Sequence, residues 1–420
     1  MNPTPIDTEE YGRRHAAVRA AMGVHGVDCL LVPINESFTY LTNVATIAYG
    51  ACLLFPLEGA PSLLVNPISY WNARTGRLTH TCYAGGELTE TVRDSCVVAD
   101  IEGVPAAQFA TRIGAWCRRR GLRGKTLGVV GRECDFPRGG GTLVGITGPA
   151  AMGGQSLKAL SDALPGMRMA DATPLLAKVR ARKSPAEIDS LRRAANLADR
   201  CRVALADRLR EPGATDSDLF AAYYRTLLAS GGAGNWWFML SVNSSAEPRL
   251  QNWRDSPMGR RLEPGDVVMA ELMPAWQDGY VGHAESCMAL ATLAQAASYE
   301  RVEAVALQSH REVVSSLGPG TPLSQVLRAA DGPIASAGFM RGAPVMYGLG
   351  LFGLEPPMVG LDEPQASETA LHANMVLCVI CHVCDPETRV SVRTGSTQLV
   401  TERGSECLNG SSPPAGIVHV

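Results

Sequence analysis

The sequence lacks any long uninterrupted apolar run. The stretch CLLFPLEGAPSLLV is broken by Pro56, Glu58 and Pro61, whereas a membrane-spanning helix needs roughly 18 consecutive apolar residues. The start, MNPTPIDTEE, also lacks the basic and then apolar pattern of a signal peptide. We therefore expect a cytoplasmic protein with no membrane partner.

The sequence also lacks an excess of charge of either sign. It has 38 basic and 41 acidic residues, a net charge of −3, and no basic stripe with interleaved aromatic residues. This composition argues against nucleic acid as a partner and favours a small-molecule substrate. The length of 420 residues and the 46% hydrophobic content are comfortable for two globular domains.

Twelve cysteines without an export signal are expected to be reduced thiols. Three of them, in LCVICHVC, have a spacing that occurs in zinc and iron–sulfur sites: Cys378, Cys381 and Cys384. The apolar, β-branched surroundings indicate a buried strand instead. On a strand, Cys381 faces away from the other two, so we expect no metal site here.

The pattern of apolar residues predicts two domains of different class. The first part alternates helical and strand-like segments, typical of an α/β domain. Ser184, Pro185 and Glu187 form a strong helix start. The second part mixes long helices with strand pairs, so it is α+β. The predicted organisation is an N-terminal domain at 1–165, a linker at 166–183, a C-terminal domain at 184–410 and a flexible tail at 411–420.

Within the C-terminal part, three further helices and two pairs of strands are indicated by the pattern of apolar residues. Helices are predicted at 217–231, 293–317 and 322–338, and strand pairs at 267–274 with 279–291 and at 374–384 with 390–401.

The segment GYVGHAESC holds a histidine and a carboxylate two residues apart, His283 and Glu285. If it is a strand, both side chains point the same way, because side chains alternate with period two. Three explanations remain open at this point: the two residues bind a metal, transfer protons without one, or simply pair in a core.

Several stretches resemble the creatinase / aminopeptidase P / methionine aminopeptidase family, whose fold is called pita-bread. They are KSPAEIDSLRRAANLAD, REPGATDSDL, LEPGDVVMAEL followed by GYVGHAESCMAL, and MYGLGLFGLEPP. NESFTYLTN resembles the start of the smaller creatinase-type domain that precedes it. The resemblance implies a C-terminal pita-bread domain, a creatinase-like N-terminal α/β domain and a homodimer.

Peptidases of this family hold two metal ions with two aspartates, one histidine and two glutamates. The corresponding positions here are Glu271, His283, Tyr347, Ile380 and Gly395, and no glutamate lies between positions 389 and 401. Two nearby divalent ions need bridging carboxylates to offset their mutual repulsion. We therefore expect no metal ion and no other cofactor.

The resemblance extends to creatinase, which works without metal and has a glutamate in a G-Y-x-x-x-x-E motif. Here GYVGHAE places Glu285 at that position. Our leading hypothesis is a metal-independent creatinase-like hydrolase or lyase that acts on a C–N bond of a small polar metabolite. His283, Glu285, Glu271 and Tyr347 would be catalytic, and the carboxylate would favour the charged form of His283.

Four more residues are candidates for substrate binding: Arg254, Trp236, Trp237 and His382. Each has a structural alternative as a packed or solvated side chain. Two other functions stay open: a non-catalytic pseudo-peptidase that serves as a binding module, and a rewired single-metal aminopeptidase-like or biosynthetic enzyme.

Overall fold

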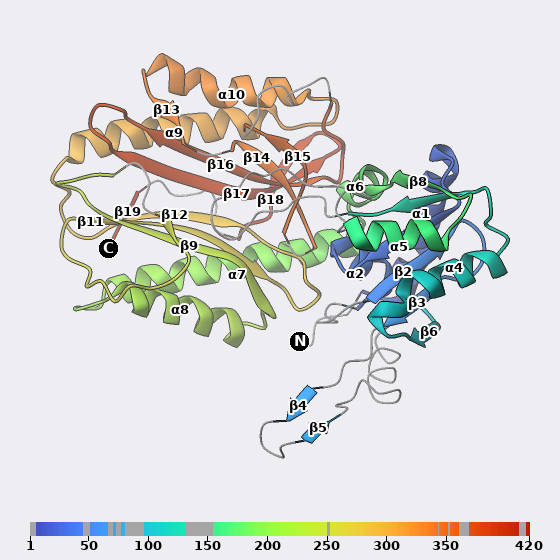
Figure 1. Cartoon of the computed structure of the whole chain (residues 1–420). Helices are drawn as coiled ribbons and strands as arrows, with labels where there is room; N and C mark the ends of the chain where they lie inside the picture. The colour runs from blue at the N-terminus through green and yellow to red at the C-terminus, as the bar shows by residue number, and fades with distance from the viewer. Residues whose placement is uncertain are drawn as a thin grey trace. The chain divides into compact units, whose positions relative to one another are not determined.

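The computed structural model divides the chain into two compact units, residues 1–180 and 181–420, and each unit is described here by itself. Figure 1 shows the elements of both. Among the residues described, no helix is both long and apolar enough to cross a membrane. The structure describes residues 6–44, 51–65, 70–72, 77–79, 96–131, 154–249, 253–342, 344–351, 353–360, 369–410 and 417–420.

The N-terminal unit is built on a six-stranded sheet in the order β6-β3-β2-β1-β7-β8. β1 runs parallel to β7 but antiparallel to β2, so the sheet is mixed. Its strands are β1 (Cys29–Pro33), β2 (Ala51–Pro56), β3 (Ser62–Val65), β6 (Asp100–Gly103), β7 (Thr126–Val129) and β8 (Arg168–Asp171). β4 (Tyr70–Asn72) and β5 (Arg77–Thr79) pair as a separate hairpin. The helices are α1 (Thr8–His25), α2 (Glu36–Thr42), η1 (Ala106–Gln108), α4 (Phe109–Arg119), α5 (Gly154–Ala163) and α6 (Thr173–Ala181).

The stretch 166–183, for which the sequence predicted a linker, contains regular structure. β8 pairs in parallel with β7, and α6 follows it directly. The strand has only four residues. They are exposed or partly buried and do not form an apolar run. A strand this short and this polar at a sheet edge gives too weak a periodic signal to be recognised from sequence.

The C-terminal unit contains two sheets. One has the order β10-β9-β11-β12-β19, and the other has the order β15-β14-β16-β17-β18 with β13 beside β16. The strands of the first are β9 (Gly234–Ser244), β10 (Trp253–Arg254), β11 (Asp266–Ala275), β12 (Ala284–Ala289) and β19 (Ile417–His419). Those of the second are β13 (Met340–Arg341), β14 (Met346–Gly350), β15 (Gly353–Val359), β16 (Val376–Cys384), β17 (Ser391–Thr401) and β18 (Gly404–Cys407). The sheets contact each other through β12 and β17.

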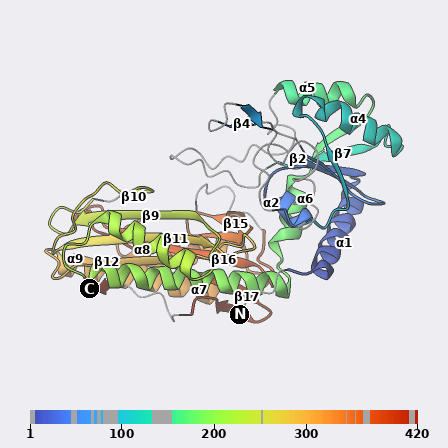
Figure 2. The ribbon, with the colours of Figure 1, turned by 90° about the horizontal axis from the view of Figure 1, so that it is seen from below.

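Two pairs of helices cover these sheets, one pair on each. α7 (Pro185–Leu209) packs on β11 and β12, and α8 (Asp216–Ala229) packs on α7 and β9. α9 (Ala296–Ser316) packs on β16 and β17, with α10 (Leu323–Ser336) against it. Figure 2 shows α7 and α8 lying along the first sheet. The predicted helix start is confirmed, because the Ser184 side chain accepts from the Glu187 N–H and Glu187 caps in return.

The end of the chain differs from the predicted flexible tail. Residues 417–419 form β19, which pairs in parallel with β12, and Val420 N donates to Ala289 O. Residues 411–416 of that predicted tail lie outside the residues described. The short apolar run IVHV is paired because β12 is buried and its outer edge needs a hydrogen-bonding partner. The predicted α+β class and the order of helices and strand pairs in the C-terminal part are confirmed.

Candidate functional site

Three potential ligand groups converge on one face of the β11–β12 pair. Glu271 lies opposite Glu285 in the antiparallel register, so their side chains leave the same face. His283 precedes Glu285 by two positions and therefore shares that face. The donor atoms of Glu271, His283 and Glu285 all lie within 4.8 Å of one another, and all three residues are buried. The alternation that the sequence predicted thus brings these side chains together.

A guanidinium from the other sheet closes the cluster. Arg393, on β17, places Nη2 3.0 Å from Glu271 Oε2 and 2.8 Å from Glu285 Oε1. The same Glu285 oxygen lies 2.9 Å from His283 Nε2. One buried cation therefore binds both carboxylates, and the imidazole shares one of them. The indole ring of Trp253 covers Arg393, with Cζ 4.8 Å from the ring centroid.

Tyr347 contributes a hydroxyl from β14. It is 2% exposed and donates to Glu271 Oε1 over 3.3 Å, with Met273 Sδ 3.7 Å away. Its ring meets the imidazole of His283 edge-on, with 6.3 Å between the centroids. Glu271 is thus held by a phenol and a guanidinium together.

The backbone of His283 is fixed from two directions. Thr397 Oγ1 accepts from the His283 N–H over 3.1 Å and donates to its carbonyl over 3.0 Å. Asn409 Nδ2 donates to the same carbonyl over 3.1 Å. The preceding residue must be glycine, because a Cβ at Gly282 would overlap the backbone of Ala194 on α7. These contacts orient the imidazole before any ligand arrives.

Burial sets the protonation state of the cluster. Burial lowers the pKa of His283 to about 3; Glu271 opposes this change and Arg393 adds to it. Burial raises the pKa of Glu285 to about 7 against the opposing effect of Arg393, and it also raises the pKa of Glu271. Glu271 does favour the charged form of His283, as the sequence predicted for a neighbouring carboxylate, but burial outweighs this effect. Burial, to which Arg393 adds, therefore keeps the imidazole neutral.

The second sheet does not supply the glutamates that the resemblance led us to look for. Ile380 and Gly395 lie opposite each other in the β16–β17 register. A Cβ built on Gly395 would lie 2.6 Å from Glu285 Cγ and 3.1 Å from His283 Cε1. The Glu285 side chain thus occupies the space that a residue at position 395 would need. The local packing leaves no room there for a carboxylate.

The structure distributes the predicted substrate-binding residues unevenly. His382 lies opposite Arg393 in register, and its ring stands 6.4 Å from that of Trp253. Trp237 lies opposite Met273 and so on the Glu271 face of the first sheet. The side chain of Trp236 lies outside the described part of the chain. Arg254 does not join the cluster; it lines a separate small cavity with Asp216 and Phe220.

Two residues of the cluster were missed from the sequence, Arg393 and Trp253. Trp253 and Arg254 are adjacent on β10, so their side chains face opposite sides of the strand. The indole of Trp253, rather than the side chain of Arg254, lies over the cluster. For Arg393 a signal existed. It precedes Gly395 by two positions and must share the face of that ligand position. A cation on a predicted buried face needs a carboxylate partner.

Two family models match the chain. The model described as metallopeptidase family M24 matches residues 189–402, and the one described as creatinase/prolidase N-terminal domain matches residues 14–182. A curated relative named "Probable dipeptidase PepE", found in Mycobacterium tuberculosis and Mycobacterium bovis, is 22% identical over 413 residues and covers 97% of both chains.

Solved structures show the same fold. The dipeptidase PepE of Mycobacterium ulcerans has a TM-score of 0.74 and 21% identity, covering 99% of this chain and 100% of that one. An Xaa-Pro dipeptidase of Bacillus anthracis has a TM-score of 0.76 and 17% identity, covering 98% and 100%. A prolidase of Pyrococcus horikoshii has a TM-score of 0.72 and 17% identity, covering 95% and 99%.

These comparisons overturn the leading functional hypothesis from the sequence. A metal-independent creatinase-like hydrolase or lyase acting on a C–N bond of a metabolite is wrong, because the matching family is one of metallopeptidases and the relatives carry the names of dipeptidases and prolidases. The G-Y-x-x-x-x-E pattern misled the argument. Glu285 holds that position because it pairs with Arg393 and His283, a local arrangement that one motif does not distinguish from substrate binding.

Proposed function

Because the chain belongs to metallopeptidase family M24, we propose that it hydrolyses a peptide or peptide-like amide bond in a small substrate. The catalytic centre is the cluster of Glu271, His283 and Glu285. The observation that carries the proposal is the convergence of these three buried donors within 4.8 Å. The dipeptidase and prolidase names of the relatives support a substrate of dipeptide size.

The residues present do not fit two metal ions. In the peptidases that the sequence resembles, four carboxylates balance two divalent ions, four negative charges against four positive ones. This cluster has the two carboxylates of Glu271 and Glu285, and Arg393 offsets one of them. Even with both carboxyl groups ionised, the net charge of −2 + 1 = −1 leaves the repulsion between two ions uncompensated.

The same residues fit one divalent ion. Histidine with two carboxylates is a donor set that zinc and manganese accept, and the neutral state of His283 keeps a lone pair available for a ligand. Glu285 Oε2 is buried and has no hydrogen-bond partner among the residues that the structure describes. An ion held by Glu271, His283 and Glu285 would supply a Lewis acid that polarises the amide carbonyl and acidifies a water.

The remaining residues position this centre. Arg393 fixes the two carboxylates relative to each other through one nitrogen, and Trp253 keeps water from its outer face. The Tyr347 hydroxyl, now donating to Glu271, is placed to donate to a developing anion on the substrate. Trp237 and His382 flank the cluster as candidate walls of the substrate site.

The expected homodimer also remains a proposal, which light scattering tests.

Metal content and turnover measured on the same samples test the proposal. The wild-type chain is incubated with manganese, zinc or cobalt, desalted, analysed for metal and assayed on a panel of dipeptides that includes Xaa-Pro. We expect about one ion per chain and hydrolysis of at least one dipeptide. The variants His283→Ala and Glu271→Gln are expected to lose both the metal ion and the hydrolysis.

Glu300→Gln, at an exposed carboxylate on α9, is the matched control and should retain both properties. Uptake of two ions would contradict the charge argument. An absence of hydrolysis with every metal and dipeptide would contradict the proposed function.

A further inference from the structure

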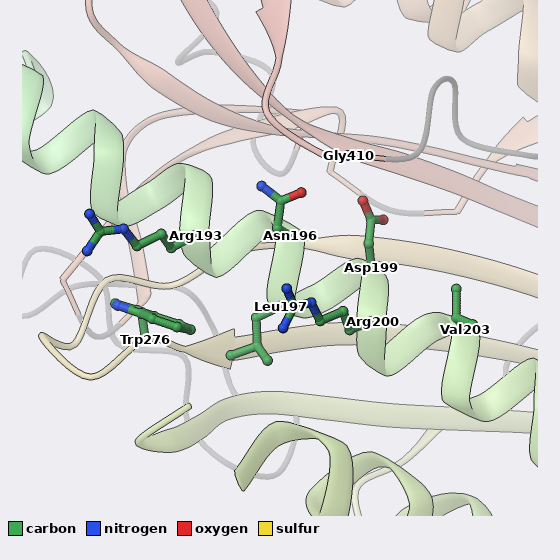
Figure 3. A pocket seen from close by; sticks show the side chains of 8 residues that line it. All are labelled: Arg193, Asn196, Leu197, Asp199, Arg200, Val203, Trp276 and Gly410. Carbon is green, nitrogen blue, oxygen red and sulfur yellow. The ribbon is translucent and has the colours of Figure 1, made fainter. Parts of the chain in front are cut away.

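A cavity of about 500 Å³ lies on α7 in the C-terminal unit, apart from the catalytic cluster. Figure 3 shows the side chains that line it. Arg193 and Arg200 come from α7, two helical turns apart, and Trp276 comes from the turn between β11 and β12. The volume is in the range of pockets that take small organic ligands.

Both arginines are available to a ligand. Arg200 is exposed and has no hydrogen bond or ion pair to any residue that the structure describes. Arg193 contacts Asp189 over 2.9 Å, but the Asp189 side chain is 61% exposed. Such a surface ion pair contributes little, so Arg193 loses little by turning to another anion. The two guanidinium groups extend toward the side of α7 where Trp276 lies (Figure 3).

The opposite wall is apolar and rigid. Trp276 packs partly buried against the core beneath α7. Its backbone is held by the turn, since its N–H donates to Tyr280 O over 2.8 Å and its carbonyl accepts from Gly279 N over 2.9 Å. Leu197, 1% exposed, forms the floor beside it. A flat indole beside two guanidinium groups suits a planar ring that carries a negative charge.

The charges around the cavity favour an anion. Among the residues that line it, Arg193 and Arg200 are basic and Asp199 is acidic, so the sum is 2 − 1 = +1. Asp199, which also lines the cavity, has the Arg202 guanidinium 3.7 Å away. The positive charge of Arg200 is therefore the one that remains uncompensated.

We propose that this cavity binds a small aromatic carboxylate, with the ring against Trp276 and Leu197 and the carboxylate on Arg200 and Arg193. A carboxylate matches the planar fork of a guanidinium, and the apolar wall selects an organic anion over inorganic phosphate. The site is separate from the proposed catalytic centre, so its occupancy does not depend on hydrolytic activity.

Isothermal titration calorimetry on the full chain tests this site with three probes: 2-naphthoate, its neutral amide 2-naphthamide, and inorganic phosphate. We expect 2-naphthoate to bind with a Kd of about 1 mM or tighter, which is ordinary for a ligand of this size. The amide is expected to bind about tenfold more weakly, because it lacks the charge-assisted hydrogen bonds. Phosphate should give no saturable heat.

Arg200→Ala is expected to weaken 2-naphthoate binding about tenfold without affecting the fold, since the side chain is exposed. Arg225→Ala, at another exposed arginine on α8, is the matched control and should bind as the wild type does. Equal affinities for the acid and the amide, or an Arg200→Ala variant with unchanged affinity, would overturn the proposal. So would phosphate that binds as tightly as 2-naphthoate.

Discussion

The two sheets of the C-terminal unit contribute opposite chemistry to one site. The β11–β12 pair supplies two carboxylates and an imidazole, all on one face. The β14–β16–β17 sheet supplies a guanidinium and a phenol, and at two positions it supplies only Ile380 and Gly395. The resemblance led us to expect anionic ligands on both sheets. Instead, the carboxylates of the first sheet face the guanidinium of the second. The difference indicates that the centre has been rebalanced in charge rather than simply emptied of ligands.

Removing the cation should break this balance most strongly. Arg393→Met leaves two buried carboxylates without a counter-charge, and we expect a loss of about 3–5 kcal/mol in the free energy of unfolding. Urea denaturation measures it, with Arg225→Ala as the control. Adding Glu285→Gln to Arg393→Met should recover part of the loss, because only one buried carboxylate then remains.

The Arg393→Met variant also tests whether metal binds here. With the guanidinium gone, both carboxyl groups become free to ionise against a metal ion, so zinc or manganese should raise the midpoint of thermal unfolding more in the variant than in the wild type. A loss in unfolding free energy below about 1 kcal/mol together with no metal response would contradict the opposition between the sheets.

Filling the space at Gly395 should disturb the site from the other sheet. Its Cβ would lie 2.6 Å from Glu285 Cγ and 2.7 Å from Val379 O, so we expect Gly395→Ala to cost up to about 3 kcal/mol. Gly234→Ala, on β9, is the matched control because a Cβ there has nothing within 4 Å. Equal unfolding midpoints for the two variants would show that the facing strands separate easily.

The second sheet should also confer a pH dependence through His382. Burial, aided by Arg393, lowers the pKa of His382 to about 3, so the folded chain keeps it neutral while the unfolded chain protonates it below about 6.5. The unfolded state then binds more protons, and stability falls as the pH drops through this window. At pH 5 the loss from this residue is about 2 kcal/mol.

Comparing urea denaturation at pH 7.5 and pH 5 isolates this effect. The difference between the two pH values should shrink by about 2 kcal/mol in His382→Gln, whereas His25→Gln, at an exposed histidine of α1, should leave it unchanged. An unchanged difference in His382→Gln would contradict a neutral buried imidazole beside Arg393.

The smallest expected effect on stability is that of Tyr347→Phe. The hydroxyl makes one long hydrogen bond to Glu271, 3.3 Å, so its loss should cost about 1 kcal/mol or less in stability. Turnover should fall much further if the phenol donates to the substrate, about 100-fold. Tyr299→Phe, at a buried tyrosine of α9, is the control. Equal turnover in wild type and Tyr347→Phe would remove the phenol from the mechanism.

Local pattern was sufficient to predict much of the first sheet. Period-two alternation placed His283 and Glu285 together, and the strand pair at 267–274 and 279–291 implied that Glu271 would be near. The capping residues at Ser184 and Glu187 likewise set the start of α7. In each case the determining contacts lie within a few residues or one hairpin.

The second sheet was harder to predict because its contribution depends on which strand faces which. Arg393 lies more than 100 positions from Glu271 and Glu285, and only the packing of β17 on β12 brings them within 3.0 Å. The neutral state of His283 was missed because burial between the two sheets, with a smaller contribution from Arg393, outweighs the effect of the carboxylate. β19 was missed because its pairing partner, β12, is just as distant.

Gly395 also has a consequence for the redesign of this site. A glutamate placed at this position by a single substitution would collide with the Glu285 side chain. Glu285 would first have to be replaced by a smaller residue. Arg393 would then lose one of its carboxylate partners and would have to be replaced as well. The construction of a two-metal ligand set on this backbone would therefore pass through destabilised variants.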